Sequence, residues 1–424
     1  MATTGKGRSP LRFGIIGASG YAGVLIDTLE PFVGRGEVEL AAAVVRSPAK
    51  IPERAESLRR SGCRLYSDWE VMVESEAGAL DLLIVPTGIQ SHRPMAERAL
   101  GLGHRVFLEK PVAATIEDAL AVAEAVERSG GRAVLGYQDL SRSSAWWVKR
   151  RVGEGAIGEV RAIRGVGLWP RGEDYYARNS WAGSLKAGEE WVLDSPVNNA
   201  FAHFLNLMLF WAAADGRSCA DCERVEAELY RSRPIESFDT ASLRARTADG
   251  PVIEFHCTHS CREYADPVLR IEGTRGHIEW DHGRRVRLES GGETEVLPME
   301  SGVEGREQCF AQTIRWMRGE EARVCTVAQG LGQTLCVNAL HRPGIPIRDR
   351  EGAPVEVPDW GRLPALEGVE AAMRKAFEGG GLLSENGVAW AAEPGVATIP
   401  EDWRRETRRR IERSLAAEAT AKPE

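Results

Sequence analysis

The chain has 424 residues, 43% hydrophobic and 27% charged, a balance typical of globular proteins, and its length allows two or three packed domains. The formal net charge of −8, with no Lys/Arg run before the last predicted helix, argues against a nucleic-acid-binding surface. No apolar run is long enough to span a bilayer, and residues 1–10 are short and polar. We therefore expect no membrane span, no signal peptide and a cytoplasmic location.

The first predicted elements are a strand over residues 11–16, a glycine turn over 17–23 and a helix over 24–29. Such a turn lets the backbone approach a pyrophosphate closely, and the free N–H groups at the start of the helix attract negative charge. A flexible turn without a ligand is the alternative. However, the preceding strand and the following helix stand at the offsets that a dinucleotide-binding motif requires.

Four residues of this turn are candidate cofactor-binding residues: Gly17, Ser19, Gly20 and Tyr21. Ser19 stands where the second glycine of the G-x-G-x-x-G pattern is usual, although Gly20 follows at once and Ala22 provides the small third residue. The Ser19 hydroxyl could donate a hydrogen bond to a phosphate.

A second strand over 38–45 ends in Arg46 and Ser47, with Lys50 shortly after. NAD-binding domains usually carry Asp or Glu there for the ribose 2′-hydroxyl, and an acidic residue would repel a 2′-phosphate that these side chains would bind. We therefore expect NADP as the preferred cofactor and NAD as the alternative. A solvated surface charge is the other interpretation of Arg46.

Two further strands, over 81–85 and 105–108, end in polar segments. Ligands bind at the carboxyl ends of the strands in doubly wound sheets. We therefore expect these candidate cofactor-binding residues to gather there: Thr87, His92, Glu109 and Lys110. The alternation continues with helices over 94–100 and 116–128 and a strand over 133–137. It predicts an α/β fold with a doubly wound parallel sheet covered on both faces.

Five segments resemble, in order and spacing over residues 12 to about 345, the glucose-fructose oxidoreductase, inositol dehydrogenase and rhizopine catabolism (Gfo/Idh/MocA) family. They are the glycine turn, Pro86-Thr87 with His92 downstream, Glu109-Lys110-Pro111, Gly136-Tyr137-Gln138 and Gly155-Ala156-Ile157-Gly158-Glu159-Val160. The Glu-Lys-Pro segment is the most specific of them.

The resemblance implies a dinucleotide-binding Rossmann domain over residues 1–140, with Gln138 among the cofactor contacts. It further implies a substrate-binding and oligomerisation α/β domain over 141–350, whose large, open, mostly antiparallel sheet forms one wall of the active site. We expect a homo-oligomer, and a peripheral C-terminal extension over 351–424.

The resemblance gives Lys110 a catalytic role, and lysine chemistry agrees with it. An ammonium near the reacting oxygen can polarise that oxygen and relay a proton, particularly when partial burial lowers its pKa. A salt bridge to Glu109 at the strand end is the alternative.

The strand predicted over 159–169 leads into residues 170–183, a segment that is both aromatic and charged. Aromatic rings stack on the C–H faces of sugars, while Arg, Asp and Asn bind hydroxyls. Trp169 and this loop are therefore candidate contacts for a small polyhydroxylated substrate. A loop packed by its own aromatic residues is the alternative.

Members of the family usually carry an Asp, three other residues and a catalytic His at the start of the next helix. Here the Asp is Asp194, and Asn198 stands in place of the His. An amide cannot take up a proton near neutral pH, so the usual base is absent from its usual position. Asp194 and Asn198 are candidate substrate-binding residues.

His203 follows five residues after Asn198, and on a helix it would share a face with Asn199. We expect His203 to contact the substrate as the displaced catalytic acid or base, with Asn199 orienting the substrate. A core histidine among apolar neighbours is the alternative.

Eight cysteines are scattered through the chain, which suits reduced thiols better than disulfides. Cys219 and Cys222 have C-x-x-C spacing and are followed by Cys257 and Cys261, so a zinc site is one interpretation. The looser second pair, in a strand-like run, favours ordinary buried thiols, and we expect no metal. The remaining scaffold comprises strands over 242–247, 251–258, 268–273 and 277–280, an apolar segment over 311–317, and helices over 327–340 and 401–417.

These features predict an NAD(P)-dependent dehydrogenase or reductase acting on an alcohol or carbonyl carbon of a sugar, sugar derivative or cyclitol. One alternative is a tightly bound cofactor that supports a net redox-neutral elimination, hydrolysis or epimerisation. A second is a non-catalytic nucleotide-binding sensor, against which the retained Glu109-Lys110-Pro111 argues. A semialdehyde dehydrogenase would need an activated cysteine, and none of the eight has a supporting motif.

Overall fold

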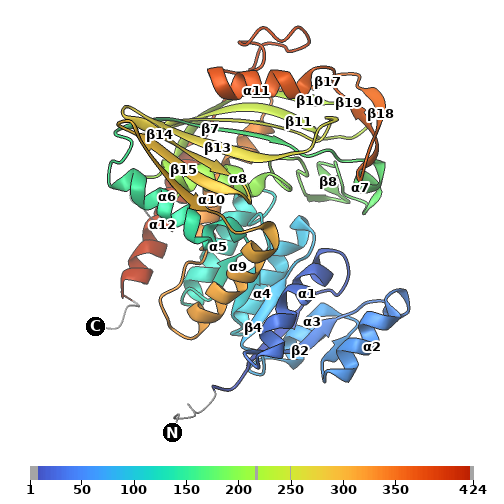
Figure 1. Cartoon of the computed structure of the whole chain (residues 1–424). Helices are drawn as coiled ribbons and strands as arrows, with labels where there is room; N and C mark the ends of the chain where they lie inside the picture. The colour runs from blue at the N-terminus through green and yellow to red at the C-terminus, as the bar shows by residue number, and fades with distance from the viewer. Residues whose placement is uncertain (1–7, 215–217, 249, 421–424) are drawn as a thin grey trace.

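The structure, a computed structural model, describes residues 8–214, 218–248 and 250–420, so most of the polar segment 1–10 lies outside the described residues. A six-stranded sheet near the N-terminus is followed by a ten-stranded sheet, stacked above it in Figure 1. The predicted fold class, a parallel α/β sheet followed by a large, mostly antiparallel one, is confirmed. Among the described residues, none of the helices is both long and apolar enough to cross a membrane.

The first sheet is wholly parallel, with strand order β3-β2-β1-β4-β5-β6. This is the order of dinucleotide-binding sheets, in which a crevice opens at the carboxyl ends of β1 and β4. Its elements are β1 (Leu11–Ile15), α1 (Tyr21–Gly34), β2 (Val38–Val44), η1 (Pro48–Lys50), α2 (Pro52–Arg60), β3 (Arg64–Tyr66), α3 (Trp69–Ser75), β4 (Leu82–Val85), η2 (Ile89–Ser91), α4 (His92–Gly101), β5 (Val106–Leu108), α5 (Ile116–Arg128), β6 (Ala133–Leu135) and η3 (Gln138–Ser141).

The second sheet has the order β16-β15-β14-β13-β7-β12-β11-β10-β17, and β20 also pairs with β10. In the described part of this second sheet, two pairs of strands are parallel, β7 with β12 and β10 with β17, and the other pairs are antiparallel. Two further pairs of strands, β8 with β9 and β18 with β19, form separate two-stranded sheets. The elements after η3 are α6 (Ser143–Gly153), β7 (Val160–Leu168), α7 (Glu173–Ala177), β8 (Lys186–Ala187), β9 (Glu190–Trp191), α8 (Ala202–Ala212), β10 (Cys222–Arg231), β11 (Thr240–Thr247), β12 (Val252–Thr258), β13 (Ala265–Gly273), β14 (Gly276–Asp281), β15 (Arg285–Ser290), β16 (Glu293–Pro298), α9 (Gly302–Met317), α10 (Val327–Leu340), β17 (Ile347–Asp349), β18 (Ala353–Val357), β19 (Gly361–Ala365), α11 (Val369–Gly379), β20 (Gly395–Thr398) and α12 (Glu401–Thr420).

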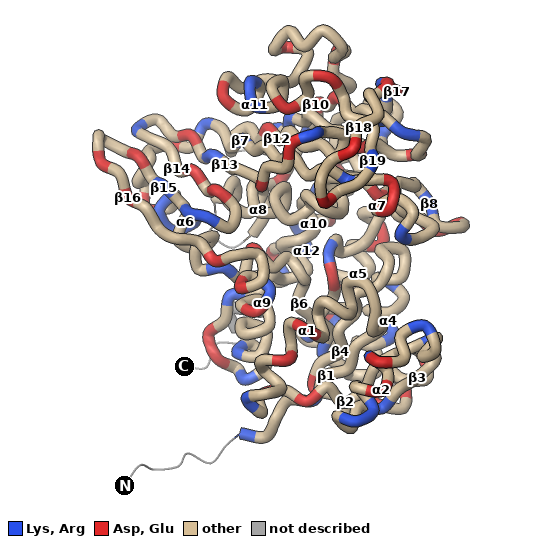
Figure 2. Tube along the Cα trace, turned by 45° about the vertical axis from the view of Figure 1, so that its right-hand side comes forward, with Lys and Arg blue, Asp and Glu red and all other residues tan. Residues whose placement is uncertain are grey.

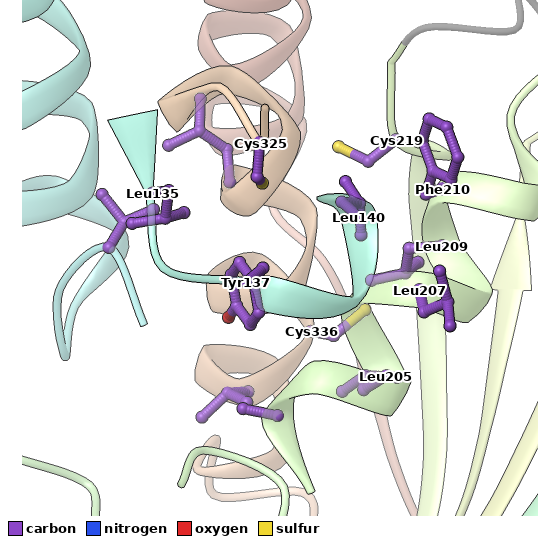
Figure 3. Packing of buried hydrophobic residues seen from close by; sticks show 14 of the residues in the cluster. Leu135, Tyr137, Leu140, Leu205, Leu207, Leu209, Phe210, Cys219, Cys325 and Cys336 are labelled. Atoms are coloured by element: carbon purple, nitrogen blue, oxygen red, sulfur yellow. The ribbon is translucent and has the colours of Figure 1, made fainter. Parts of the chain in front are cut away.

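Two helices, α8 and α10, form the core between the sheets. Every residue of α10 is buried, as is nearly every residue of α8; both helices are mostly apolar, and the buried Gln333 and Asn338 of α10 are hydrogen-bonded. Figure 3 shows Leu205 and Leu209 of α8 packed near Leu140 of η3 and Cys336 of α10. These contacts connect the end of the first sheet to the second sheet.

Helix α9 packs back against the first sheet, beside α1 (Figure 1). Phe310 of α9 stacks on Phe107 of β5 with ring centroids 5.2 Å apart. The predicted apolar segment 311–317 is the end of this helix, whose start is fixed by a capping box between Ser301 and Glu304.

Residues 351–420 contact both domains. Strand β20 pairs with β10, and α11 covers the outer face of the second sheet by packing on Val166 and Leu168 (Figure 1). Helix α12 reaches the first domain, where Arg410 forms ion pairs with Glu124 and Glu127 of α5. The polar composition of α12 reflects these ion pairs as well as solvent exposure.

Candidate active site

The glycine turn after β1 has the geometry that a pyrophosphate requires. Gly17 and Gly20 have φ angles of +116° and +56°, and Gly20 precedes the first residue of α1. No side chain caps this helix end, and Ser19, Gly20 and Tyr21 are exposed. The N–H groups of the first turn are therefore open to an anionic group.

The end of β2 presents a small basic surface beside this turn. Arg46, Ser47 and Lys50 are all exposed, and β2 pairs directly with β1. Within the described ranges, no acidic side chain pairs with Arg46, so its guanidinium is available to a phosphate.

The sequence predicts that His92 contacts the cofactor, but the structure places its side chain inside the protein. Its ring is fully buried, with Nδ1 2.8 Å from the Pro111 carbonyl oxygen and Nε2 3.3 Å from that of Thr87. Burial lowers the pKa of His92 to about 4, so the ring is neutral. His92 therefore ties the loop after β4 to the loop after β5, while the half-buried Thr87 and Gln138 remain near the surface of the crevice.

Glu109 and Lys110 leave the end of β5 together. The Glu109 carboxylate is buried and accepts a 3.1 Å hydrogen bond from the Lys110 backbone N–H. Burial raises the pKa of Glu109 to about 7, against the opposing charge of Lys110. A Cβ on the neighbouring Gly136 would lie 2.6 Å from a Glu109 oxygen, so a larger residue there would displace the Glu109 carboxylate.

A hydrogen-bonded chain runs from Lys110 into the second domain. The ammonium of Lys110 donates to the main-chain oxygen of Asn199 at 2.9 Å and to its side-chain oxygen at 3.1 Å. The Asn199 amide donates in turn to Asp194 at 2.8 Å. The other Asp194 oxygen accepts from the Gly183 N–H at 2.7 Å and lies 3.8 Å from Arg178. The structure thus brings Lys110, Asn199 and Asp194 into one cluster.

This cluster has perturbed protonation equilibria. Burial lowers the pKa of Lys110, an effect that the charges of Glu109 and Asp194 oppose. Burial also raises the pKa of Asp194, although Arg178 opposes this. Perturbed ionisable groups converging at the carboxyl end of a parallel strand are typical of acid–base sites.

Asn198, in contrast, is enclosed by the protein. It is fully buried, its amide nitrogen donates to the Val192 and Leu193 carbonyl oxygens, and its oxygen accepts from Gln333 of α10 at 3.3 Å. The expected substrate contact is therefore not available at Asn198. Gln333, which the sequence analysis missed, fixes this turn because the polar pair is enclosed between α8 and α10.

His203 stands at the second residue of α8, which begins at Ala202. Asn198 and Asn199 precede the helix, so the helical spacing used to group Asn199 with His203 does not apply. Burial, followed by the charge of Lys110, lowers the pKa of His203 to about 3. His203 thus lies within electrostatic reach of Lys110, with its ring edge against Tyr137, at a centroid distance of 5.7 Å.

Trp169 is packed more tightly than a sugar-stacking platform requires. Its ring stacks on Phe201 with centroids 4.7 Å apart, and its indole N–H donates to Asp266 at 3.0 Å. The following loop contains α7, where Arg178 lies over the Tyr175 ring at 3.7 Å. Much of this segment therefore fits the alternative interpretation, a loop packed by its own aromatic residues.

The cysteines are all buried and free of disulfides. The thiol of Cys222 forms a hydrogen bond with Cys336, which, with burial, raises its pKa. Burial likewise raises the pKa of Cys309 to about 12. In the part of the chain that the structure describes, no group of three or more His, Cys, Asp or Glu side chains has the geometry to hold a metal ion.

Sequence comparison finds two matching family models. An oxidoreductase family model with an NAD-binding Rossmann fold (GFO_IDH_MocA) matches residues 11–137, and the GFO/IDH/MocA C-terminal domain model matches residues 146–279. The chain is 29% identical over 149 residues to dTDP-3,4-didehydro-2,6-dideoxy-alpha-D-glucose 3-reductase of Streptomyces violaceoruber, covering 35% of this chain and 42% of that protein. It is 24% identical over 231 residues to D-apiose dehydrogenase of Paraburkholderia graminis, covering 53% and 56%. The chain thus spans about half the length of these curated relatives.

Solved structures of similar fold cover more of the chain. An oxidoreductase from Agrobacterium radiobacter, in complex with NAD+, L-tartaric acid and magnesium, has a TM-score of 0.63 and 20% identity, covering 78% of this chain and 95% of that one. Levoglucosan dehydrogenase in complex with NADH and levoglucosan has a TM-score of 0.64 and 17% identity, with the same coverage. At these identities, the likeness shows a common fold.

Proposed function

Because the chain belongs to the Gfo/Idh/MocA family of oxidoreductases, we propose that it transfers a hydride between a nicotinamide dinucleotide and an alcohol or carbonyl carbon of a sugar, sugar derivative or cyclitol. The observation that carries this proposal is the chain of hydrogen bonds from Lys110 through Asn199 to Asp194. It lies at the carboxyl end of β5, where the crevice of a doubly wound sheet binds ligands.

The residues around the crevice fit a dinucleotide. Gly17, Ser19, Gly20 and Tyr21 would hold the pyrophosphate at the uncapped start of α1. Arg46 and neighbouring residues would hold a ribose 2′-phosphate, and this favours NADP over NAD. When bound, the nicotinamide supplies the hydride donor or acceptor.

Lys110 polarises the reacting oxygen in this proposal. Its ammonium makes two hydrogen bonds to Asn199 and has a third N–H for the substrate oxygen. Burial lowers its pKa and so makes it a better proton donor than an exposed lysine. In this proposal, Asp194 and Asn199 orient Lys110 and also bind hydroxyl groups of the substrate, because a polyol needs polar side chains around it.

His203 is the proposed second acid or base, in place of the histidine absent at 198. Burial lowers its pKa to about 3, so the ring is neutral and one of its nitrogens carries a free lone pair, although burial also makes that nitrogen a weaker base. Its ring has a side-chain exposure of 11%, so it is not wholly enclosed.

A redox-neutral reaction with a retained cofactor is the main alternative. It would also use Lys110, but it would produce no free reduced cofactor. A non-catalytic sensor would not need the perturbed Lys110–Asn199–Asp194 cluster, which argues against that function.

Part of the second sheet is already covered and is not free for the subunit contact of the expected homo-oligomer. Helix α11 already covers part of the outer face of the second sheet. The same face carries ion pairs from Arg244 to Glu226 at 3.0 Å and to Glu254 at 2.9 Å, and Figure 2 shows both charge signs interspersed over this layer. We propose that any subunit contact through this sheet uses the open end at β14–β16.

The test of the proposed function has two stages. Titration of the purified protein with NADPH and NADH, followed by fluorescence, measures cofactor binding, and failure to bind either at millimolar concentration would overturn the proposal. A panel of sugars, sugar acids and cyclitols with each oxidised cofactor then measures turnover. Steady-state production of free NADPH or NADH supports a dehydrogenase, whereas product formation without it supports the redox-neutral alternative.

A further inference from the structure

A buried carboxylate lies behind His203, on the side away from solvent. Asp139 of η3 is 1% exposed, and one of its oxygens accepts a 2.7 Å hydrogen bond from the fully buried Arg142. Its other oxygen lies 3.7 Å from Nδ1 of His203. A second imidazole, that of His282 just after β14, places its Nδ1 4.0 Å from Asp139.

The two histidines share an unusual feature. Nδ1 of His203 and Nδ1 of His282 are both enclosed, and neither has a hydrogen-bond partner among the described residues. An enclosed polar nitrogen without a partner is unfavourable, and the nearest ionisable acceptor for both is Asp139. Both separations exceed hydrogen-bond length and are too short to hold a bridging water, so a direct hydrogen bond requires a small closure of the three elements.

Aromatic packing fixes both rings around this carboxylate. The His203 ring meets Tyr137 edge-on at 5.7 Å, and the His282 ring meets Phe204 edge-on at 5.1 Å. Trp280 lies 5.3 Å from His282 on its other side. This packing holds the plane of each ring beside Asp139, and of the ring atoms it is Nδ1 that lies within 4.0 Å of the carboxylate.

We propose that Asp139 is the positioning residue for the catalytic base: it holds His203 as the tautomer protonated at Nδ1, so that Nε2 is the proton acceptor, and His282 is bound through its own Nδ1 to the same carboxylate. This inference rests on the proposed function and deepens it, because it explains how a histidine at 203 serves a site that lacks the histidine at 198.

Charges around the cluster agree with this arrangement. Burial raises the pKa of Asp139, but Arg142, His282 and His203 outweigh it, so the pKa lies below its usual range and the group is ionised. The groups that face His203 are Lys110, Asp139, His282 and Arg142, and burial with the charge of Lys110 keeps its ring neutral. A neutral imidazole beside an anionic carboxylate places its proton on the nearer nitrogen.

The proton step is balanced in this arrangement. As the hydride leaves the substrate carbon for the cofactor, the substrate O–H bond breaks and an Nε2–H bond forms on His203, while the Nδ1 proton stays in place. The resulting imidazolium is stabilised by Asp139, whose charge is present throughout. The alcohol becomes a carbonyl, and the proton later leaves from Nε2.

Nitrogen-15 NMR of the full chain with labelled histidine tests the tautomer directly. The His203 signals are assigned by their loss in His203→Gln, and we expect a protonated Nδ1 and an unprotonated Nε2. In Asp139→Asn, the signals of His203 and His282 should shift and those of the other histidines should not. Ser242→Ala is the matched control, because it removes the 2.9 Å partner of His256, another fully buried histidine, and should shift His256 alone.

Kinetics supply the second readout, with the best substrate from the panel. Asp139→Asn should lower kcat about 100-fold, within the range of general acid–base contributions, while KM and the NADPH Kd change less than about threefold. Asp139→Glu should restore part of kcat. If Asp139→Asn does not fold because Arg142 loses its partner, Asp139→Asn with Arg142→Gln removes both charges and tests the same point.

A His203 protonated at Nε2 in the wild type, or unchanged His203 signals in either Asp139 variant, would overturn the inference. An equal fall in kcat for Ser242→Ala would also do so, because it would show a general effect of core damage. If the wild type binds no dinucleotide, the proposed function fails, and the tautomer result still reports separately on the Asp139–His203 contact.

Discussion

The Lys110 ammonium donates to both oxygens of Asn199, to the main chain at 2.9 Å and to the side chain at 3.1 Å. This double contact joins the end of β5 in the first domain to the turn before α8 in the second. The two domains therefore hold the Lys110 side chain between them, and any change in their relative position would alter its hydrogen bonds.

The first prediction concerns Lys110 itself. Lys110→Ala removes the ammonium that polarises the reacting oxygen, so turnover should fall by at least about 100-fold. Cofactor affinity should be retained, because the glycine turn and the β2 end are untouched. Steady-state kinetics and NADPH titration measure the two effects.

Lys375→Ala is the control for Lys110, because it removes an exposed lysine that donates to the Asn386 carbonyl oxygen at 2.8 Å. It should leave turnover unchanged. Turnover by Lys110→Ala at the rate of this control would refute the assigned role.

The second prediction concerns the missing family histidine. Asn198→His should not create a better base, because the amide is enclosed and hydrogen-bonded to Val192, Leu193 and Gln333. The larger ring cannot reproduce these bonds, so we expect a loss of about 1–3 kcal/mol in the free energy of unfolding. Urea denaturation measures this loss, and a gain in kcat with unchanged stability would contradict the structure.

Sequence patterns predicted the first sheet well because its contacts are local and repetitive. Each apolar strand run is followed by a helix, and Lys110 comes at a strand end, where its place in the crevice follows from topology alone. Asp194 was found through the family resemblance, and Asn199 through a helical spacing from His203 that the structure does not have. Their contact with Lys110 depends on how the two domains meet.

The burial of two other candidate residues was not foreseen for the same reason. His92 and Asn198 are polar residues in promising positions, but tertiary contacts bury both. Asp139 was missed because His203 and His282 come from elements far along the chain, and no local spacing joins them. The local signal was an acidic residue directly after Gly136-Tyr137-Gln138.

The third prediction concerns cofactor choice. Arg46 is exposed at the end of β2, so Arg46→Asp replaces a 2′-phosphate-binding charge by a repelling one without disturbing the core. The Kd for NADPH should rise at least about tenfold, about 1.4 kcal/mol, while that for NADH should change little or fall. Parallel titrations of wild type and variant test this, with Arg59→Asp on the exposed face of α2 as the charge-matched control. Retained NADPH selectivity in Arg46→Asp would remove the argument for NADP.

The fourth prediction is a pH dependence of stability that originates at Glu109. Burial raises its pKa from 4.5 to about 7 in the folded protein, so between these values the folded state binds more protons than the unfolded state. The free energy of unfolding should therefore fall as pH rises from about 4.5 to about 7 and should be independent of this group above that range. The full effect is about 3 kcal/mol, since each unit of pKa difference is worth about 1.4 kcal/mol.

Glu109→Gln removes this dependence, because the amide is neutral at every pH and nearly the same shape. Urea denaturation at pH 5 and pH 8 should show a smaller loss of stability in the variant than in the wild type. Glu356→Gln, at an exposed position on β18, is the matched control and should follow the wild type. The stability difference between wild type and Glu109→Gln should thus grow with pH, and a constant difference would mean that Glu109 is already ionised in the folded protein at pH 5.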